Sequence, residues 1–183
     1  DRPVYTFWDL GIDDPTAIVF AYIEGDKAEI IDYYENTGHD IKHYLDVIAE
    51  KGYRYAGHYM PHDSKKRMGN TGTNILDFCR TQYYFEARPI PKTNSVRDDI
   101  EIVRRHLPSC RIDISLESLL EHLTNYQWNP TTGRILHNEH SHGADAVRMM
   151  FMAIHHNMIN EYLLTPKSQL DRREYIVDDY LIF

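Results

Sequence analysis

Cysteines and long hydrophobic runs are scarce in this sequence of 183 residues. The two cysteines, Cys79 and Cys110, do not have the spacing of a disulfide framework, so we expect both to be reduced intracellular thiols. No run of about 18 apolar residues occurs, and the sequence therefore holds no candidate for a membrane-spanning helix. Internal repeats and low-complexity tracts are also lacking.

Positive charge is scarce as well: 20 lysines and arginines stand against 28 aspartates and glutamates, which gives a formal net charge of −8. A chain with this balance is not attracted to nucleic acid over its whole surface. It weighs against a stand-alone DNA-binding protein, although a local basic strip would still suit a nuclease. The hydrophobic content of 42% and the length are those of one globular domain with a real core.

The first part of the chain predicts three consecutive strands. Residues 4–10 alternate, with Val4, Trp8 and Leu10 on one side and Tyr5 and Phe7 on the other. Turn residues then separate this stretch from further β-rich runs at 16–23 and 28–35. A three-stranded meander is therefore expected.

Helices and strands alternate in the rest of the chain. Asp40 is placed to cap a helix that ends at Gly52, and Asn94 or Ser95 is placed to cap another. This order predicts a mixed α/β fold, a mixed sheet with helices packed on it. We expect one domain over residues 1–183, with a core at about 4–160 and an extension at about 161–183. Beyond the meander the expected elements are a helix at 41–51, a strand at 53–60, a short helix at 74–81, a strand at 83–91, a helix from 96, a short strand at 111–114, a helix from 115, a hairpin at 126–136 and a helix from 144 to about 160.

Three acids occupy positions suited to metal-dependent chemistry. Asp9 falls near the end of an apolar strand, Asp63 follows the fourth strand, and Asp145 lies in the predicted first turn of the last long helix, three residues after His142. Carboxylates that converge repel one another, and divalent ions relieve that repulsion. Two Mg²⁺ or Mn²⁺ ions would suit such a site and the hydrolysis of a phosphodiester. Singly, each acid is more often a turn residue or a partner of the helix dipole.

Three motifs sharpen this interpretation: WDLGIDDPTA at residues 8–17, YMPHD at 59–63, and HGADAVR at 142–148. Together they resemble the nuclease motifs of the large terminase subunits of tailed phages, and the resemblance covers roughly residues 4–160. It implies a ribonuclease-H-like fold, two divalent ions, and Asp9, Asp63 and Asp145 as the catalytic residues that hold them. It also implies that His142 is a fourth, weaker metal ligand.

The resemblance further implies an endonuclease that cuts double-stranded DNA during viral genome packaging. In this family the nuclease is joined to an N-terminal ATPase domain, works with a portal and a small terminase subunit, and acts in the host cytoplasm rather than in the mature virion. No phosphate loop of the form GxxxxGK[ST] occurs in the chain. We therefore expect the sequence to be the nuclease part of a longer protein.

A basic triplet, Lys65, Lys66 and Arg67, follows Asp63 closely. In a nuclease these side chains would contact the DNA backbone, although a basic triplet in a loop is as often simply solvated. Two other functions fit the sequence. One is a different ribonuclease-H-like nuclease, such as a junction resolvase or an RNA–DNA hybrid nuclease, and the other is a non-catalytic module that docks DNA or the portal.

Overall fold

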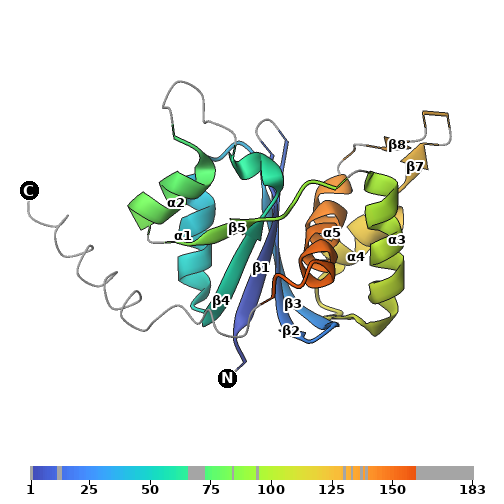
Figure 1. Ribbon diagram of the computed structural model, residues 1–183, viewed down its shortest axis with the longest axis horizontal. Coiled ribbons are helices and arrows are strands. Elements are labelled where there is room, and N and C mark those ends of the chain that lie inside the picture. The colour runs from blue at the N-terminus through green and yellow to red at the C-terminus, as the bar shows by residue number, and fades with distance from the viewer. Residues whose placement is uncertain are drawn as a thin grey trace, which may run out of the picture.

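The computed structural model describes residues 2–11, 14–65, 73–83, 85–93, 95–129, 131–132, 134–136, 138 and 140–159. These residues form a mixed sheet of six strands in the order β5-β4-β1-β2-β3-β6, with helices on both faces (Figure 1). The mixed α/β fold predicted from the sequence is confirmed. None of the helices within these ranges is long and apolar enough to cross a membrane. The predicted extension at 161–183 lies outside the described residues.

The sheet is built on the predicted meander. Strands β1 (Val4–Asp9), β2 (Thr16–Glu24) and β3 (Lys27–Asn36) pair antiparallel, and β4 (Tyr55–Met60) joins β1 in parallel. Two short strands extend the edges: β5 (Ala87–Pro89) is parallel to β4, and β6 (Arg111–Ile112) is parallel to β3. The strand expected over 83–91 is thus only three residues long, because helix α2 (Ile75–Tyr83) continues to Tyr83 and two prolines cannot donate to the ladder.

The helices begin and end largely where the capping residues predict. Asp40 accepts a hydrogen bond from the backbone of His43, Gly52 ends the helix at a φ of 66°, and Ser95 caps the helix at 96. The remaining hairpin, predicted at 126–136, consists of β7 (Trp128–Asn129) and β8 (Arg134–Ile135). The helices are α1 (Ile41–Lys51), α2 (Ile75–Tyr83), α3 (Val96–His106), α4 (Glu117–Asn125) and α5 (Ser141–His155), with 3-10 turns η1 (His62–Lys65) and η3 (Leu107–Ser109).

The two faces of β1 belong to two separate hydrophobic cores. Val4 and Trp8 pack with α1 and its neighbours, and Tyr5 and Phe7 pack against α5. Because side chains alternate along a strand, Asp9 continues the face of Tyr5 and Phe7 and so points toward α5. The alternation expected from the sequence is confirmed.

Helix α5 differs from the expectation in two ways. Twelve of its fifteen residues are buried, so it carries no single apolar stripe. The cause is its position between the sheet on one side and α3 and α4 on the other (Figure 1). It also begins at Ser141, which places Asp145 in the second turn instead of the predicted first turn. Pairing of Asp145 with the N-terminal dipole of α5, which acts within the first turn, therefore does not explain this acid.

Candidate active site

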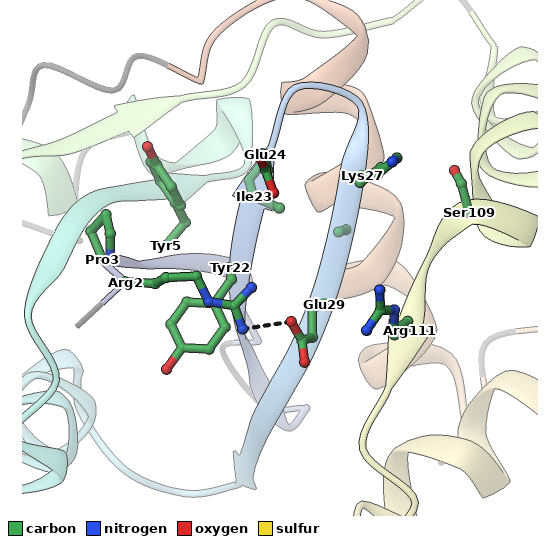
Figure 2. A pocket seen from close by; sticks show the side chains of 11 residues that line it. Arg2, Pro3, Tyr5, Tyr22, Ile23, Glu24, Lys27, Glu29, Ser109 and Arg111 are labelled. Carbon is green, nitrogen blue, oxygen red and sulfur yellow. Dashed lines mark hydrogen bonds and ion pairs between the residues drawn. The ribbon is translucent and has the colours of Figure 1, made fainter.

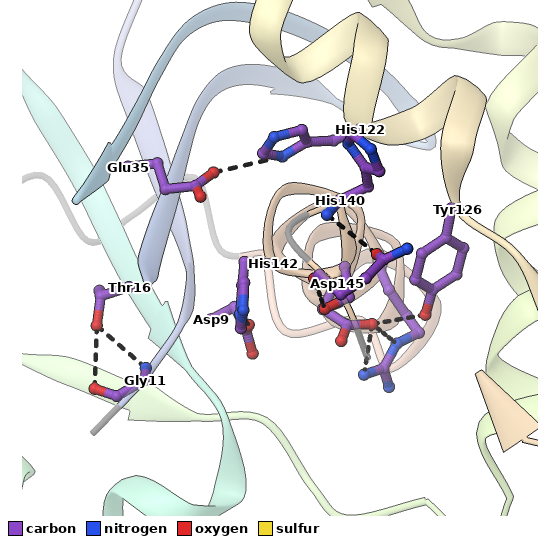
Figure 3. A network of polar contacts seen from close by, with 12 residues as sticks. Asp9, Gly11, Thr16, Glu35, His122, Tyr126, His140, His142 and Asp145 are labelled. Carbon is purple, nitrogen blue, oxygen red and sulfur yellow. Dashed lines mark hydrogen bonds and ion pairs between the residues drawn. The ribbon is translucent and has the colours of Figure 1, made fainter. Parts of the chain in front are cut away.

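Asp9 is the last residue of β1 and lies where the apolar strand meets solvent, with its side chain 23% exposed. Its Oδ2 lies 3.1 Å from Nδ1 of His142 on α5 (Figure 3). Burial raises the pKa of Asp9, the hydrogen bond from His142 opposes that shift, and the charge of Asp145 adds to it. The acid near the end of β1 is therefore stabilised by a residue that is 133 positions away in the sequence.

His142 provides the compensating charge. The hydrogen bond to Asp9 raises the pKa of His142, and the charges of Asp9 and Glu35 raise it further against the opposing effect of burial. When it is protonated, the imidazole donates from Nδ1 to Oδ2 of Asp9 and forms an ion pair with it. The structure thus brings two of the predicted site residues into direct contact.

Asp145 is held by its own neighbours. Its Oδ1 accepts hydrogen bonds from the Tyr126 hydroxyl at 2.6 Å and from Arg148 Nε at 3.1 Å, and the same oxygen forms an ion pair with Arg148 Nη2 at 3.0 Å. Arg148 reaches on to Asp99 of α3, whose Oδ2 lies 2.9 Å from Nη1. Asp145 faces Asp9 closely enough for its charge to raise the pKa of Asp9. The structure therefore brings Asp9 and His142 into contact and places Asp145 near enough to act on Asp9 through its charge (Figure 3).

Asp63 is placed differently. It lies in η1, just beyond the end of β4, and its carboxylate pairs with His62 Nε2 at 2.7 Å while remaining 48% exposed. Since β1 and β4 are parallel neighbours, Asp9 and Asp63 do lie at the same edge of the sheet. Among the residues that the structure describes, however, no group of three or more histidine, cysteine, aspartate or glutamate side chains is arranged to hold a metal ion.

The predicted basic triplet falls only partly within the described residues. Lys65 is exposed at the end of η1, close in sequence to Asp63. Lys66 and Arg67 lie outside the described residues.

Glu35 is an acid of the site that sequence reasoning missed. It lies two strands from Asp9 in one row, because Asp9 pairs with Ala17 and Ala17 pairs with Glu35. Strand spacing puts their Cα atoms about 10 Å apart on the same face. The register of the meander is the signal that could have revealed it, since an acid at that position shares the face of Asp9.

Glu35 has partners of its own (Figure 3). It accepts a short hydrogen bond from the Tyr33 hydroxyl, and His122 Nδ1 lies 3.3 Å from Oε2. Burial, followed by the contact with Glu35, raises the pKa of Tyr33, so this phenol stays a donor. Gly143 allows α5 to lie close to the side chains of His122 and Tyr33, because a Cβ at this position would lie 2.6 Å from His122 Nδ1 and 2.7 Å from the Tyr33 hydroxyl.

A pocket lies at the other end of β1 from Asp9, beside the start of the strand (Figure 2). It measures about 590 Å³, and the Arg2 guanidinium lies 4.0 Å above the Tyr22 ring and 2.6 Å from Glu29 Oε2. Arg2 is thus neutralised by Glu29. This pocket is separated from the acids above by the full length of β1, so it is not part of the candidate active site.

The residues at the carboxyl edge of the sheet fit a divalent ion. Carboxylate oxygens are preferred by Mg²⁺ and Mn²⁺, and a neutral imidazole is a further ligand for transition metals such as Mn²⁺. The two hydrogen bonds and the ion pair described above for Asp145 all reach Oδ1, which leaves Oδ2 for another contact. Asp9 and Oδ2 of Asp145 are therefore the donors best suited to hold an ion, with His142 beside them.

Neither a protein-family model nor a curated protein matches the sequence. Solved structures do. The large terminase of a thermophilic bacteriophage, in complex with ATP-γ-S, has a TM-score of 0.64 at 14% identity over 82% of this chain and 39% of that one. The chain thus spans about two fifths of that terminase.

Isolated nuclease domains are covered more completely. The P22 large terminase nuclease domain has a TM-score of 0.63 at 19% identity, over 83% of this chain and 85% of that one. The nuclease domain of g2p, the large terminase of bacteriophage SPP1, with bound Mn, has a TM-score of 0.60 at 19% identity, over 82% and 85%. The chain therefore has the ribonuclease-H-like fold of the nuclease domains of phage large terminases.

Proposed function

We propose that this chain is a divalent-metal-dependent endonuclease domain that hydrolyses the phosphodiester bonds of double-stranded DNA during phage genome packaging. The observation that carries the proposal is the meeting of Asp9, His142 and Asp145 at the carboxyl edge of β1, within a fold shared with terminase nuclease domains. The SPP1 domain, which holds Mn, supports a divalent ion at this kind of site.

In this proposal Asp9, Asp63 and Asp145 hold two Mg²⁺ or Mn²⁺ ions, and His142 is the weaker fourth ligand. The ions would supply an activated water and stabilise the departing 3′ oxygen. Asp9 contributes a desolvated carboxylate, which binds a cation more strongly than an exposed one. Asp63 is exposed and so able to turn toward the substrate. Lys65, Lys66 and Arg67 then contact the DNA backbone, with no preference for base sequence.

We also propose a further domain of the same polypeptide and two partner proteins. The thermophilic-phage terminase, of which this chain spans 39%, binds ATP-γ-S, and we propose an N-terminal ATPase domain in the same polypeptide here. A portal and a small terminase subunit would deliver the DNA in the host cytoplasm. This arrangement also suits the net charge of −8, since substrate would arrive by delivery and not by attraction to an acidic surface.

A plasmid assay tests the proposal. Supercoiled DNA is incubated with the chain and Mn²⁺, Mg²⁺ or EDTA, and the unchanged protein is compared with Asp63→Asn and Asp9→Asn. Asp26→Asn, in the exposed turn between β2 and β3, is the matched control. We expect cleavage that requires metal, disappears in the two site variants and survives in the control.

Other outcomes have definite meanings. Preference for branched DNA or RNA–DNA hybrids over plain duplex would favour another ribonuclease-H-like nuclease. No metal-dependent cleavage by any of the proteins would refute the nuclease. The second candidate, a docking module without catalysis, would then be preferred, and the pairing of Asp63 with its neighbour His62 is the observation in its favour.

A further inference from the structure

Two hydrogen bonds and an ion-pair contact converge on a single oxygen of Asp145, and from this we propose that Arg148 and Tyr126 are positioning residues of the metal centre. They fix Oδ1 of Asp145 and so present Oδ2 toward Asp9, where the ion binds. This inference rests on the proposed metal-dependent function. It adds two residues that touch neither ion nor substrate and act only through Asp145.

The geometry of the clamp, defined as Tyr126 and Arg148 on Asp145, is specific. The Tyr126 hydroxyl donates at 2.6 Å and Arg148 Nε at 3.1 Å, and Arg148 Nη2 forms an ion pair at 3.0 Å, all with Oδ1. A carboxylate can accept hydrogen bonds at both of its oxygens, so contacts that all fall on one oxygen fix that oxygen and leave the other for a different partner. In Figure 3 Tyr126 lies on the side of Asp145 that is turned away from Asp9.

Both donors are kept in their donating forms. Burial and the charge of Asp145 raise the pKa of Tyr126, so the phenol remains protonated. Burial alone would lower the pKa of Arg148, but the charge of Asp145, its hydrogen bond to Arg148 and the charges of Tyr126 and Asp99 together outweigh burial and raise that pKa. Asp145, only 7% exposed, is therefore matched by a permanent positive charge.

Asp99 and Thr93 hold the Arg148 side chain of the clamp in place. Asp99, which is 1% exposed, accepts from Arg148 Nη1 at 2.9 Å and from the Thr93 hydroxyl at 2.9 Å, both at Oδ2. Arg148 thus spans two carboxylates with one planar guanidinium, which a lysine ammonium cannot reproduce. Asp99 comes from α3, so the orientation of Asp145 on α5 is tied to a neighbouring helix.

A buried ion pair alone is weak evidence for a functional role, because hydrophobic replacements are often as stable. The convergence on Oδ1 is what distinguishes this one. A pair that served stability alone would gain by using both oxygens of Asp145, whereas this arrangement leaves Oδ2 without any of these donors. Residues that orient a metal ligand in this way typically change metal affinity by about 10- to 100-fold when they are replaced.

The test measures Mn²⁺ binding by isothermal titration calorimetry on the 183-residue chain. The variants are Tyr126→Phe, which removes one hydroxyl, and Arg148→Lys, which keeps the positive charge but loses the planar guanidinium that contacts both Asp145 and Asp99. The matched control is Arg80→Lys on α2, because Arg80 forms the same i,i+3 pair with Asp77 at 2.9 Å on an exposed surface. Metal-free melting temperature is recorded in parallel, so that a loss of stability is separated from a loss of affinity.

We expect the dissociation constant for Mn²⁺ to rise about 10-fold in Tyr126→Phe and up to about 100-fold in Arg148→Lys, with no change in the control. Tyr126→Phe removes one hydrogen bond to a buried carboxylate, so we expect a small drop in its metal-free melting temperature, smaller than that of Arg148→Lys, while the chain still folds and its affinity for Mn²⁺ falls. If Arg148→Lys fails to fold, Tyr126→Phe decides.

Equal affinity in the unchanged chain and in the clamp variants, with binding abolished by Asp9→Asn, would overturn the clamp and leave the metal centre standing. No Mn²⁺ binding by the unchanged chain would overturn both.

Discussion

Replacing Arg148 by methionine should cost the chain much of its stability, because two buried acids lose a shared counter-charge. The Arg148 side chain is 15% exposed, and those of Asp99 and Asp145 are 2% and 10% exposed. Methionine fills a similar volume but donates no hydrogen bond. Asp99 would keep only the Thr93 hydroxyl, at Oδ2, since its buried Oδ1 finds no hydrogen-bond partner in the described part of the chain.

The size of the effect follows from the burial. Removing one partner of a buried ion pair costs about 3–5 kcal/mol, and we take about 3 kcal/mol because Asp145 retains Tyr126. For a chain of this length each kcal/mol lowers the melting temperature by about 2–4 °C, so Arg148→Met should melt about 6–12 °C lower. Differential scanning calorimetry without metal measures this directly.

A double-mutant cycle separates the ion pair from other effects of the substitution. In an Asp99→Asn background, Arg148→Met should cost about 1–3 kcal/mol less, because one of the two stranded charges is already absent. Costs that add within about 0.5 kcal/mol would refute the view that Arg148 compensates Asp99.

Three further predictions concern other regions. Asp40→Ala removes the cap of α1 and should lower the unfolding free energy by about 1 kcal/mol, whereas Asp46→Ala, which loses only a surface pair, should lower it by less than half as much in urea titrations. Burial lowers the pKa of His122, so its contribution to stability is present above the ordinary histidine pKa of about 6.5 and is lost as the pH falls below it. His122→Gln should therefore flatten the decline in melting temperature below a pH of about 6.5, and an unchanged slope would contradict this. Burial raises the pKa of Cys79 to about 12 and that of Cys110 to about 11. Both thiols of the native chain should therefore react with a disulfide reagent at a pH of about 8 far more slowly than after unfolding. Rapid reaction of both thiols in the native chain would contradict this.

Local signals made most of the fold predictable. The alternation of β1 assigned Tyr5 and Trp8 to opposite faces, and the caps at Asp40 and Ser95 marked helix starts, because each depends on residues only a few positions apart. The strand at 83–91 was overestimated, since its length depends on where α2 ends and on what β4 offers as a partner.

Some residues of the candidate site could be recognised from local sequence signals, and others could not. Asp9 was recognisable as an acid in an apolar strand, and His142 and Asp145 by their spacing on one helix. Glu35 and the partner of Arg148, Asp99, were not, because strand register and the packing of α3 on α5 bring them there. The assignment of Asp9, Asp63, Asp145 and His142 as metal ligands stays a prediction.

The separation of the sheet into two cores has a consequence for engineering. Asp9, Glu35, His142 and Asp145 all belong to the side of the sheet that α5 covers, and the side under α1 carries none of them. Libraries of substitutions in the core under α1, around Val4 and Trp8, would therefore change the melting temperature of the domain without replacing any residue of the candidate active site. One layer of the domain can therefore accept substitutions while the other keeps the residues of the candidate site.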